Sequence, residues 1–129
     1  MAVEIKWIIT GRVLLVDLIG NVPLGEFRDA VNQASKELNN YAQPPYAHVI
    51  FKSTDAMIPP TNVKLMREIT QNYFVNPHLG YTIIISNDQV HRFLSSVTAQ
   101  MFQSRWRSFG TYQEGMSFLE TIDKTLANA

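Results

Sequence analysis

Apolar and polar positions along the chain follow two periodicities, one typical of β-strands and one typical of amphipathic helices. In residues 3–9 apolar side chains recur at every second position, which predicts a strand with one well-buried face. Thr10-Gly11 then predicts a turn into a second strand, RVLLVDLIG, so that the two strands form a hairpin. From Pro23 onward apolar residues recur every three or four positions, which predicts a helix ending near residues 39–40.

The rest of the chain continues the same alternation. Further strands are predicted by three segments, AHVIFK (47–52), YTIIIS (81–86) and RWRSF (105–109). Further helices are predicted by apolar stripes that begin near Val63, after Asn87-Asp88, and at the capping box Thr111-x-x-Glu114. The element order is therefore β-β-α-β-α-β-α-β-α.

This order predicts an α/β fold in a single domain, residues 1–129, with a mostly parallel five-stranded sheet and four helices. The first strand should lie antiparallel at one edge. Strands such as YTIIIS are apolar at odd and even positions alike, which is typical of strands buried on both faces. If most helices lie on one face, the other face needs a cover: the first helix, an internal apolar ligand or a second copy of the chain.

Composition excludes several classes of function. Eleven basic residues balance eleven acidic ones, so no general electrostatic attraction toward nucleic acid or an anionic membrane is expected. A local basic patch stays open, with Arg92, Arg105 and Arg107 as its candidates. There is no cysteine, which excludes disulfides and thiolate chemistry. The apolar runs fall well short of the ~20 residues that span a bilayer, and the first residues do not resemble a secretory signal. We therefore expect a soluble, cytoplasmic protein without an integral membrane segment.

A likeness to a known family is carried by four segments: EIKWIITGRVLLVDLIGNV, HVIFK with the PP loop after it, HLGYTIIIS, and RFLSSVTAQMFQSRWRSFGTYQEGMSFL. In pattern and element order the chain resembles the STAS fold of anti-sigma-factor antagonists. It is more similar still to SpoIIAA-like proteins of unassigned function, which are distantly similar to lipid-carrier domains. The resemblance covers nearly the whole chain and implies the fold, but it includes no catalytic signature.

In the antagonist branch, the loop after the third strand carries an Asp-Ser-Ser-Gly motif in which a partner kinase phosphorylates a serine. The matching positions here are Pro60, Thr61, Asn62 and Val63, so only Thr61 keeps a hydroxyl. The motif is not retained, and Thr61 is a weak phosphoacceptor candidate. Its residue type and position favour a helix N-cap, in which the hydroxyl accepts from a backbone N–H two or three residues on.

The loop STDAMIPPTN (53–62) is the predicted site of partner contact. It follows a strand at the sheet edge where α/β proteins usually bind ligands, and its two prolines restrict the residues before them to extended conformations. It therefore predicts a stiff rim rather than a reactive loop. The candidate rim residues are Thr54, Asp55, Ile58, Pro59, Pro60, Thr61 and Asn62.

No catalytic, metal or cofactor constellation can be assembled from the sequence. His48, His78 and His91 lack the spacing to a second ligand that a metal site needs. SRWRSF interleaves basic and aromatic residues, as some single-stranded nucleic acid sites do, but arginines on an edge strand more often prevent sheet-to-sheet pairing.

These observations predict a non-enzymatic interaction or regulatory module that binds a protein partner or forms a homodimer, with no nucleic acid and no cofactor. The alternative is a carrier of an apolar small molecule or lipid.

Overall fold

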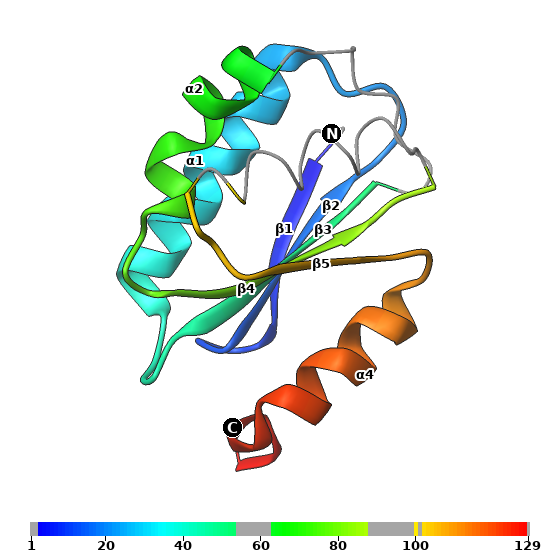
Figure 1. Cartoon of the computed structure of the whole chain (residues 1–129). Coiled ribbons are helices and arrows are strands. Elements are labelled where there is room, and N and C mark those ends of the chain that lie inside the picture. Colours follow the sequence, from blue (N-terminus) through cyan, green and yellow to red (C-terminus); the bar gives the residue numbers. More distant parts are fainter. Residues whose placement is uncertain (1–2, 54–62, 88–99, 101, 129) are drawn as a thin grey trace.

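A computed structural model describes residues 3–53, 63–87, 100 and 102–128 of the chain. The elements run in the order β1 (Val3–Ile9), β2 (Val13–Leu18), α1 (Leu24–Tyr41), β3 (Ala47–Lys52), α2 (Val63–Phe74), β4 (Leu79–Ile85), β5 (Trp106–Phe109), α4 (Tyr112–Ile122) and the 3-10 helix η1 (Lys124–Asn128). Figure 1 shows one central sheet flanked by helices on both sides. The predicted strands are all present, and their bounds agree with the expected segments to within a few residues.

The five strands form one sheet in the order β1-β2-β3-β4-β5. β1 and β2 pair antiparallel, as predicted for a hairpin at the sheet edge. The other three pairings, β2–β3, β3–β4 and β4–β5, are parallel. The sheet is therefore mixed, which corrects the expectation of a mostly parallel sheet: the hairpin turn at Thr10-Gly11 is too short to carry the chain back for a parallel pairing.

The central strands β2, β3 and β4 are buried on both faces because helices cover both faces of the sheet. One apolar core lies between the sheet and α1 with α2, and it takes Leu14, Val16 and Val49 from the strands. The other takes Val13, Leu15 and Ile50 from the strands and packs against Leu119 of α4 and Leu126 of η1. Alternate residues of a strand point to opposite faces, so adjacent residues of β2 serve different cores. The cover of the second face is thus supplied by the end of the chain itself.

Within the described part of the chain there are three α-helices, where we expected four in the whole chain. The expected helix after Asn87-Asp88 falls mainly on residues 88–99 and 101, which lie outside the described residues. α1 follows the prediction closely, since Phe27, Val31, Ala34 and Leu38 are all buried. α4 begins at the predicted box, where the Thr111 hydroxyl accepts from the N–H of Glu114 at 3.2 Å.

α4 lies close to β4 because Gly115 carries no side chain. A Cβ at this position would lie 2.9 Å from Cγ2 of Ile83 and 3.0 Å from Cδ1 of Ile85. These separations are below ordinary van der Waals contact, so a larger residue would push the helix off the sheet. The residue that follows α4, Asp123, enters the buried cluster described below.

Candidate functional site

The structure places few of the predicted site residues. The rim residues 54–62, including Thr61, lie outside the described part, as do His91 and Arg92. Ser53, which opens the predicted loop, is buried and extends the β3–β4 pairing, since its N–H donates to the Ile85 carbonyl at 2.8 Å. His78 lies exposed in the loop before β4. The described residues that gather into polar arrangements lie at the other end of the sheet, where the parallel strands begin.

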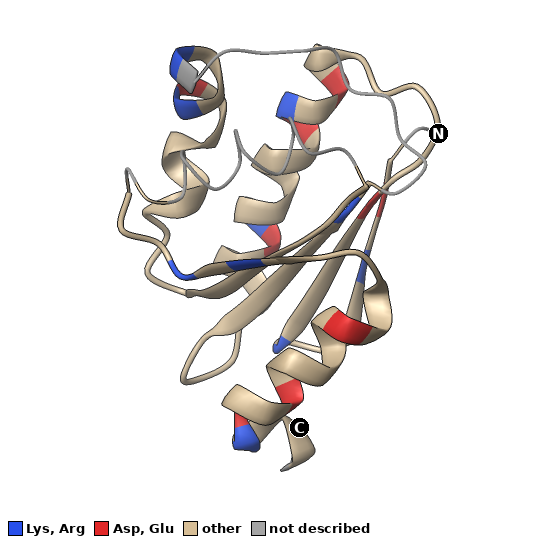
Figure 2. Cartoon of the chain, turned by 45° about the vertical axis from the view of Figure 1, so that its right-hand side comes forward, with Lys and Arg blue, Asp and Glu red and all other residues tan. Residues whose placement is uncertain are grey.

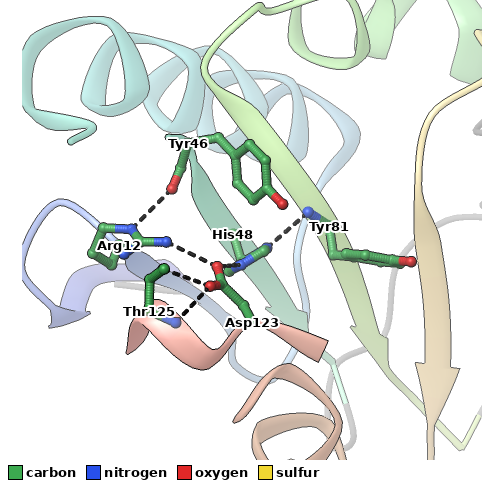
Figure 3. Close-up of polar contacts among 6 residues, drawn as sticks. All are labelled: Arg12, Tyr46, His48, Tyr81, Asp123 and Thr125. Atoms are coloured by element: carbon green, nitrogen blue, oxygen red, sulfur yellow. Dashed lines mark hydrogen bonds and ion pairs between the residues drawn. The ribbon is translucent and has the colours of Figure 1, made fainter. Parts of the chain in front are cut away.

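The first arrangement is a buried cluster of Arg12, His48 and Asp123 (Figure 3). Arg12 directly precedes β2, His48 is the second residue of β3, and Asp123 follows the last residue of α4. Arg12 and His48 are neighbours because the parallel register places Val13 beside His48. α4 returns antiparallel to the strands and delivers Asp123 between the two side chains (Figure 3).

The Asp123 carboxylate accepts hydrogen bonds on both oxygens. Oδ2 accepts from Arg12 Nη2 and from His48 Nε2, each at 2.8 Å. Oδ1 accepts from the backbone N–H of Thr125 at 3.1 Å and from its hydroxyl at 2.5 Å. Burial alone would raise the pKa of Asp123, but the bonds from Thr125 and His48 and the charge of Arg12 outweigh it and hold the pKa below its usual value of 3.8. The carboxylate stays ionised and saturated with donors.

His48 is held as a neutral imidazole. Its Nδ1 accepts from the backbone N–H of Tyr81 at 2.9 Å, so the hydrogen-bond pattern assigns the proton to Nε2, which donates to Asp123. Burial lowers the pKa of His48 below its usual value of 6.5 despite the neighbouring carboxylate. Because both nitrogens are engaged and the side chain is 0% exposed, His48 is not positioned to exchange a proton with a substrate.

Two tyrosines connect this cluster to the surface. The Tyr46 carbonyl accepts from Arg12 Nε at 3.0 Å, and the Tyr46 ring meets the His48 ring edge-on with centroids 5.3 Å apart. The Tyr81 backbone is held by His48, while Figure 3 shows its ring pointing away toward the neighbouring strand. Gly80 makes this packing feasible, since a Cβ there would lie 2.5 Å from Tyr46 Cδ1 and 2.6 Å from His48 Nδ1. The buried cluster therefore holds the backbone of both tyrosines and contacts the ring of Tyr46.

The second arrangement is a surface of two exposed arginines over aromatic rings, which we call the arginine–aromatic surface: Tyr46, Tyr81, Arg105, Arg107 and Phe118. The Arg105 guanidinium lies 4.5 Å from the Tyr46 ring centroid and 5.7 Å from that of Tyr81. The Arg107 guanidinium lies 5.9 Å from the Tyr81 centroid and 5.5 Å from that of Phe118. These distances fall within the range of cation–π attraction.

No carboxylate neutralises these two arginines within the described residues. The ion pair found there, between Arg12 and Asp123, lies in the buried cluster. Arg107 Nη1 donates to the Trp106 carbonyl at 2.8 Å, and the side chain is exposed. Figure 2 shows basic residues along β5 and the segment before it. The sequence-derived basic patch is thus represented by Arg105 and Arg107.

The described residues contain no group of three or more His, Asp or Glu side chains arranged to hold a metal ion. Nor does any described helix have the length and apolar character needed to cross a membrane.

Sequence reasoning placed His48 at a strand start but did not bring it together with Arg12 and Asp123. The available signal was that Arg12 and His48 each stand as a polar residue at the beginning of an apolar strand, RVLLV and AHVIF. Adjacent parallel strands begin at the same end of the sheet, so polar residues at the starts of two such strands become neighbours. Asp123 carried a weaker signal, the Asp-x-Thr spacing of a polar turn.

The architecture, an α/β domain with a mixed sheet and helices on both faces, has the SpoIIAA-like fold. A solved structure that it resembles is that of an uncharacterized protein from the DUF3478 family with a SpoIIAA-like fold, from Shewanella loihica PV-4. The two superpose with a TM-score of 0.61 over 92% of each chain, at 10% sequence identity. No protein-family model and no curated protein matches the chain. The likeness confirms the fold expected from the sequence, and at this identity it extends to the fold alone.

Proposed function

We propose that this chain is a non-enzymatic interaction module that binds a protein partner, or a second copy of itself. The observation that carries the proposal is the arginine–aromatic surface, in which Arg105 and Arg107 are exposed and held over rings with no carboxylate partner among the described residues. Arginine and tyrosine are enriched at protein interfaces, where they supply both apolar area and directional donors.

The buried cluster supports the non-enzymatic part of the proposal. A general acid or base must reach a substrate proton, whereas His48 is fully buried with both nitrogens engaged. The Asp123 carboxylate likewise accepts on both oxygens from the protein itself. The cluster's role is structural: it attaches the residues after α4 to the starts of β2 and β3.

Affinity purification with matched variants tests the proposal. Tagged wild-type chain, R105Q/R107Q, an alanine variant of the predicted rim over 58–62, and R28Q are compared for bound proteins in an extract of the source cell. Arg28 is an exposed arginine on α1 and serves as the charge-matched control. We expect a bound protein that R28Q retains and that R105Q/R107Q or the rim variant loses, or a dimer in light scattering that the same variants dissociate. An identical result for all four chains contradicts the proposal.

The carrier of an apolar small molecule stays an alternative prediction. It was motivated by strands that are apolar on both sides, and α4 with η1 now accounts for the second buried face. Native mass spectrometry of the purified chain would reveal a bound lipid by its added mass.

A further inference from the structure

We propose that the arginine–aromatic surface binds an extended acidic segment of a protein partner, with Arg105 and Arg107 each holding one carboxylate. This inference rests on the proposed function and specifies the chemistry of the partner. It is argued from the spacing of the two arginines, from the way their guanidiniums are held, and from their positive charge, which no carboxylate of the described residues neutralises.

The spacing of the two arginines selects the shape of the ligand. Arg107 belongs to β5 and Arg105 immediately precedes it, so the two are separated by one residue on the edge strand of the sheet. Both guanidiniums lie over Tyr81, which places both on the same face of the sheet. Alternate residues of a strand are about 6.5–7 Å apart. An extended peptide that runs along β5 presents its own alternate side chains with the same period, so acidic residues at positions i and i+2 match the pair.

The rings pre-organise the guanidiniums for this role. An arginine free in solvent loses side-chain entropy when it is immobilised in an interface, which reduces the net gain from its hydrogen bonds. Here Tyr46, Tyr81 and Phe118 hold the guanidiniums over their faces, and the backbones of both tyrosines are tied to the buried cluster. A planar guanidinium offers two parallel N–H groups that fit a carboxylate, so a prepositioned pair has both affinity and directionality.

Charge and ring exposure favour an acidic peptide over single-stranded nucleic acid. Nucleic acid sites combine a long basic groove with open aromatic faces on which bases stack. In this chain a guanidinium already lies over each of the three rings, and the net charge of the whole chain is zero. Two localised positive charges suit a ligand with two carboxylates.

Fluorescence anisotropy with short labelled peptides tests the inference on the full chain. The probe carries Glu at every second position between Thr residues. One comparison peptide has the same number of Glu residues placed at every third position, and extra Thr residues at the ends of the alternating probe give the two peptides the same length and composition. Spacing by three places neighbouring carboxylates on opposite sides of an extended chain. A second has Gln in place of every Glu. A labelled oligothymidylate of similar length measures binding through phosphates.

We expect the alternating-Glu peptide to bind with the highest affinity of these probes and to weaken as salt is added. R105Q and R107Q should each weaken its binding about fivefold to tenfold, whereas R28Q should leave it unchanged. R107K should fall between wild type and R107Q, because lysine keeps the charge and loses the planar fork. Near-UV circular dichroism of each variant confirms that it is folded.

Three results would overturn the inference: equal binding of the alternating and third-position peptides, binding that R105Q/R107Q does not change, or tighter binding of oligothymidylate than of the peptide. These failures are distinguishable from failure of the proposed function. If a cellular partner still binds wild type and is lost from the rim variant while no acidic peptide binds, the interaction module stands and the acidic ligand does not. If no cellular partner binds, no dimer forms and no acidic peptide binds, both are wrong.

Discussion

The chain uses arginine in two contrasting environments that lie next to each other. Arg12 is buried, with an exposed fraction of 4%, and its charge is neutralised by Asp123 at 2.8 Å. Arg105 and Arg107 are exposed and have aromatic rings below them in place of a carboxylate. Tyr46 joins the two environments, because its carbonyl contacts Arg12 and its ring contacts Arg105.

The contrast separates charge that stabilises the fold from charge that is available to a partner. A buried guanidinium loses its hydration, so it is tolerated only where a carboxylate and further hydrogen bonds compensate for that loss. An exposed guanidinium keeps its hydration and contributes little to folding, so its charge can still be used by a partner. We interpret Arg12 as a residue that attaches the segment after α4 to the sheet. We interpret Arg105 and Arg107 as residues of the ligand surface. The following variants break or sharpen this contrast.

The largest effect is expected from Asp123→Ala. Removing the carboxylate leaves Arg12 charged, buried and unpaired, which typically costs about 3–5 kcal/mol of unfolding free energy. Urea denaturation followed by circular dichroism measures the change. Glu120→Ala, at an exposed carboxylate of α4, is the matched control and should change stability by less than about 0.5 kcal/mol. Equal losses in the two variants would show that the cluster is not a stabilising element.

A second test uses two glycines. Gly80→Ala places a methyl group 2.5 Å from Tyr46 and 2.6 Å from His48, so it should destabilise the fold by about 1–3 kcal/mol. Gly25→Ala in α1 meets no atom within 4 Å and should stabilise the chain by up to about 1 kcal/mol, because alanine favours the helix. Thermal unfolding of both variants compares them directly. A stable Gly80→Ala chain would mean that His48 and Tyr46 are not held as tightly as their contacts indicate.

Acidification should weaken the buried cluster. Burial lowers the pKa of His48 in the folded chain below its usual value of 6.5. As pH falls, His48 is therefore protonated first in the unfolded chain. Folding stability should decrease as pH drops below about 6.5, until pH reaches the pKa of His48 in the folded chain. The pKa of Asp123 is also lowered, from 3.8, so its contribution is present above that value and is lost as pH falls through its pKa in the folded chain. Urea midpoints at pH 7.5, 6.0 and 5.0 measure the first step. In His48→Gln the urea midpoint should depend less on pH over this range. If its dependence on pH is the same as in wild type, the effect belongs to another group.

The smallest effect on stability is expected from the exposed pair. R105Q removes cation–π contacts at the surface, and R107Q removes such contacts together with an exposed hydrogen bond to the Trp106 carbonyl. Each should therefore lower the unfolding free energy by less than about 1 kcal/mol. The same urea titration measures them beside Asp123→Ala. If either variant loses as much unfolding free energy as Asp123→Ala, these arginines stabilise the fold as Arg12 does, and the contrast is wrong.

Local signals in the sequence predicted most of the fold. The stripe through Phe27, Val31 and Leu38 predicted α1, and Thr111 with Glu114 predicted the start of α4, because caps and periodicity act within a few residues. Ile122 follows Leu119 at the spacing of an apolar stripe but is 40% exposed, since it is the last residue of α4. The mixed character of the sheet was underestimated, although its antiparallel edge strand was predicted.

The candidate sites could not be predicted in the same way, because their residues meet only in the folded chain. Arg12 and Asp123 are separated by 111 positions, and neither has a local pattern that names the other. The interleaving in SRWRSF was visible, but two of the rings below its arginines come from Tyr46 and Tyr81, on the segments around β3 and β4. The predicted rim at 54–62 remains a prediction.

The most direct test of the central claim is a two-dimensional 15N–1H spectrum of the arginine Nε–Hε groups during titration with the alternating-Glu peptide. The account predicts that the signals of Arg105 and Arg107 shift with peptide concentration while that of Arg12, which donates to the Tyr46 carbonyl, stays nearly constant. If Arg105 and Arg107 do not shift, or if Arg12 shifts as much as they do, the division between a structural and a ligand-binding set of arginines is contradicted.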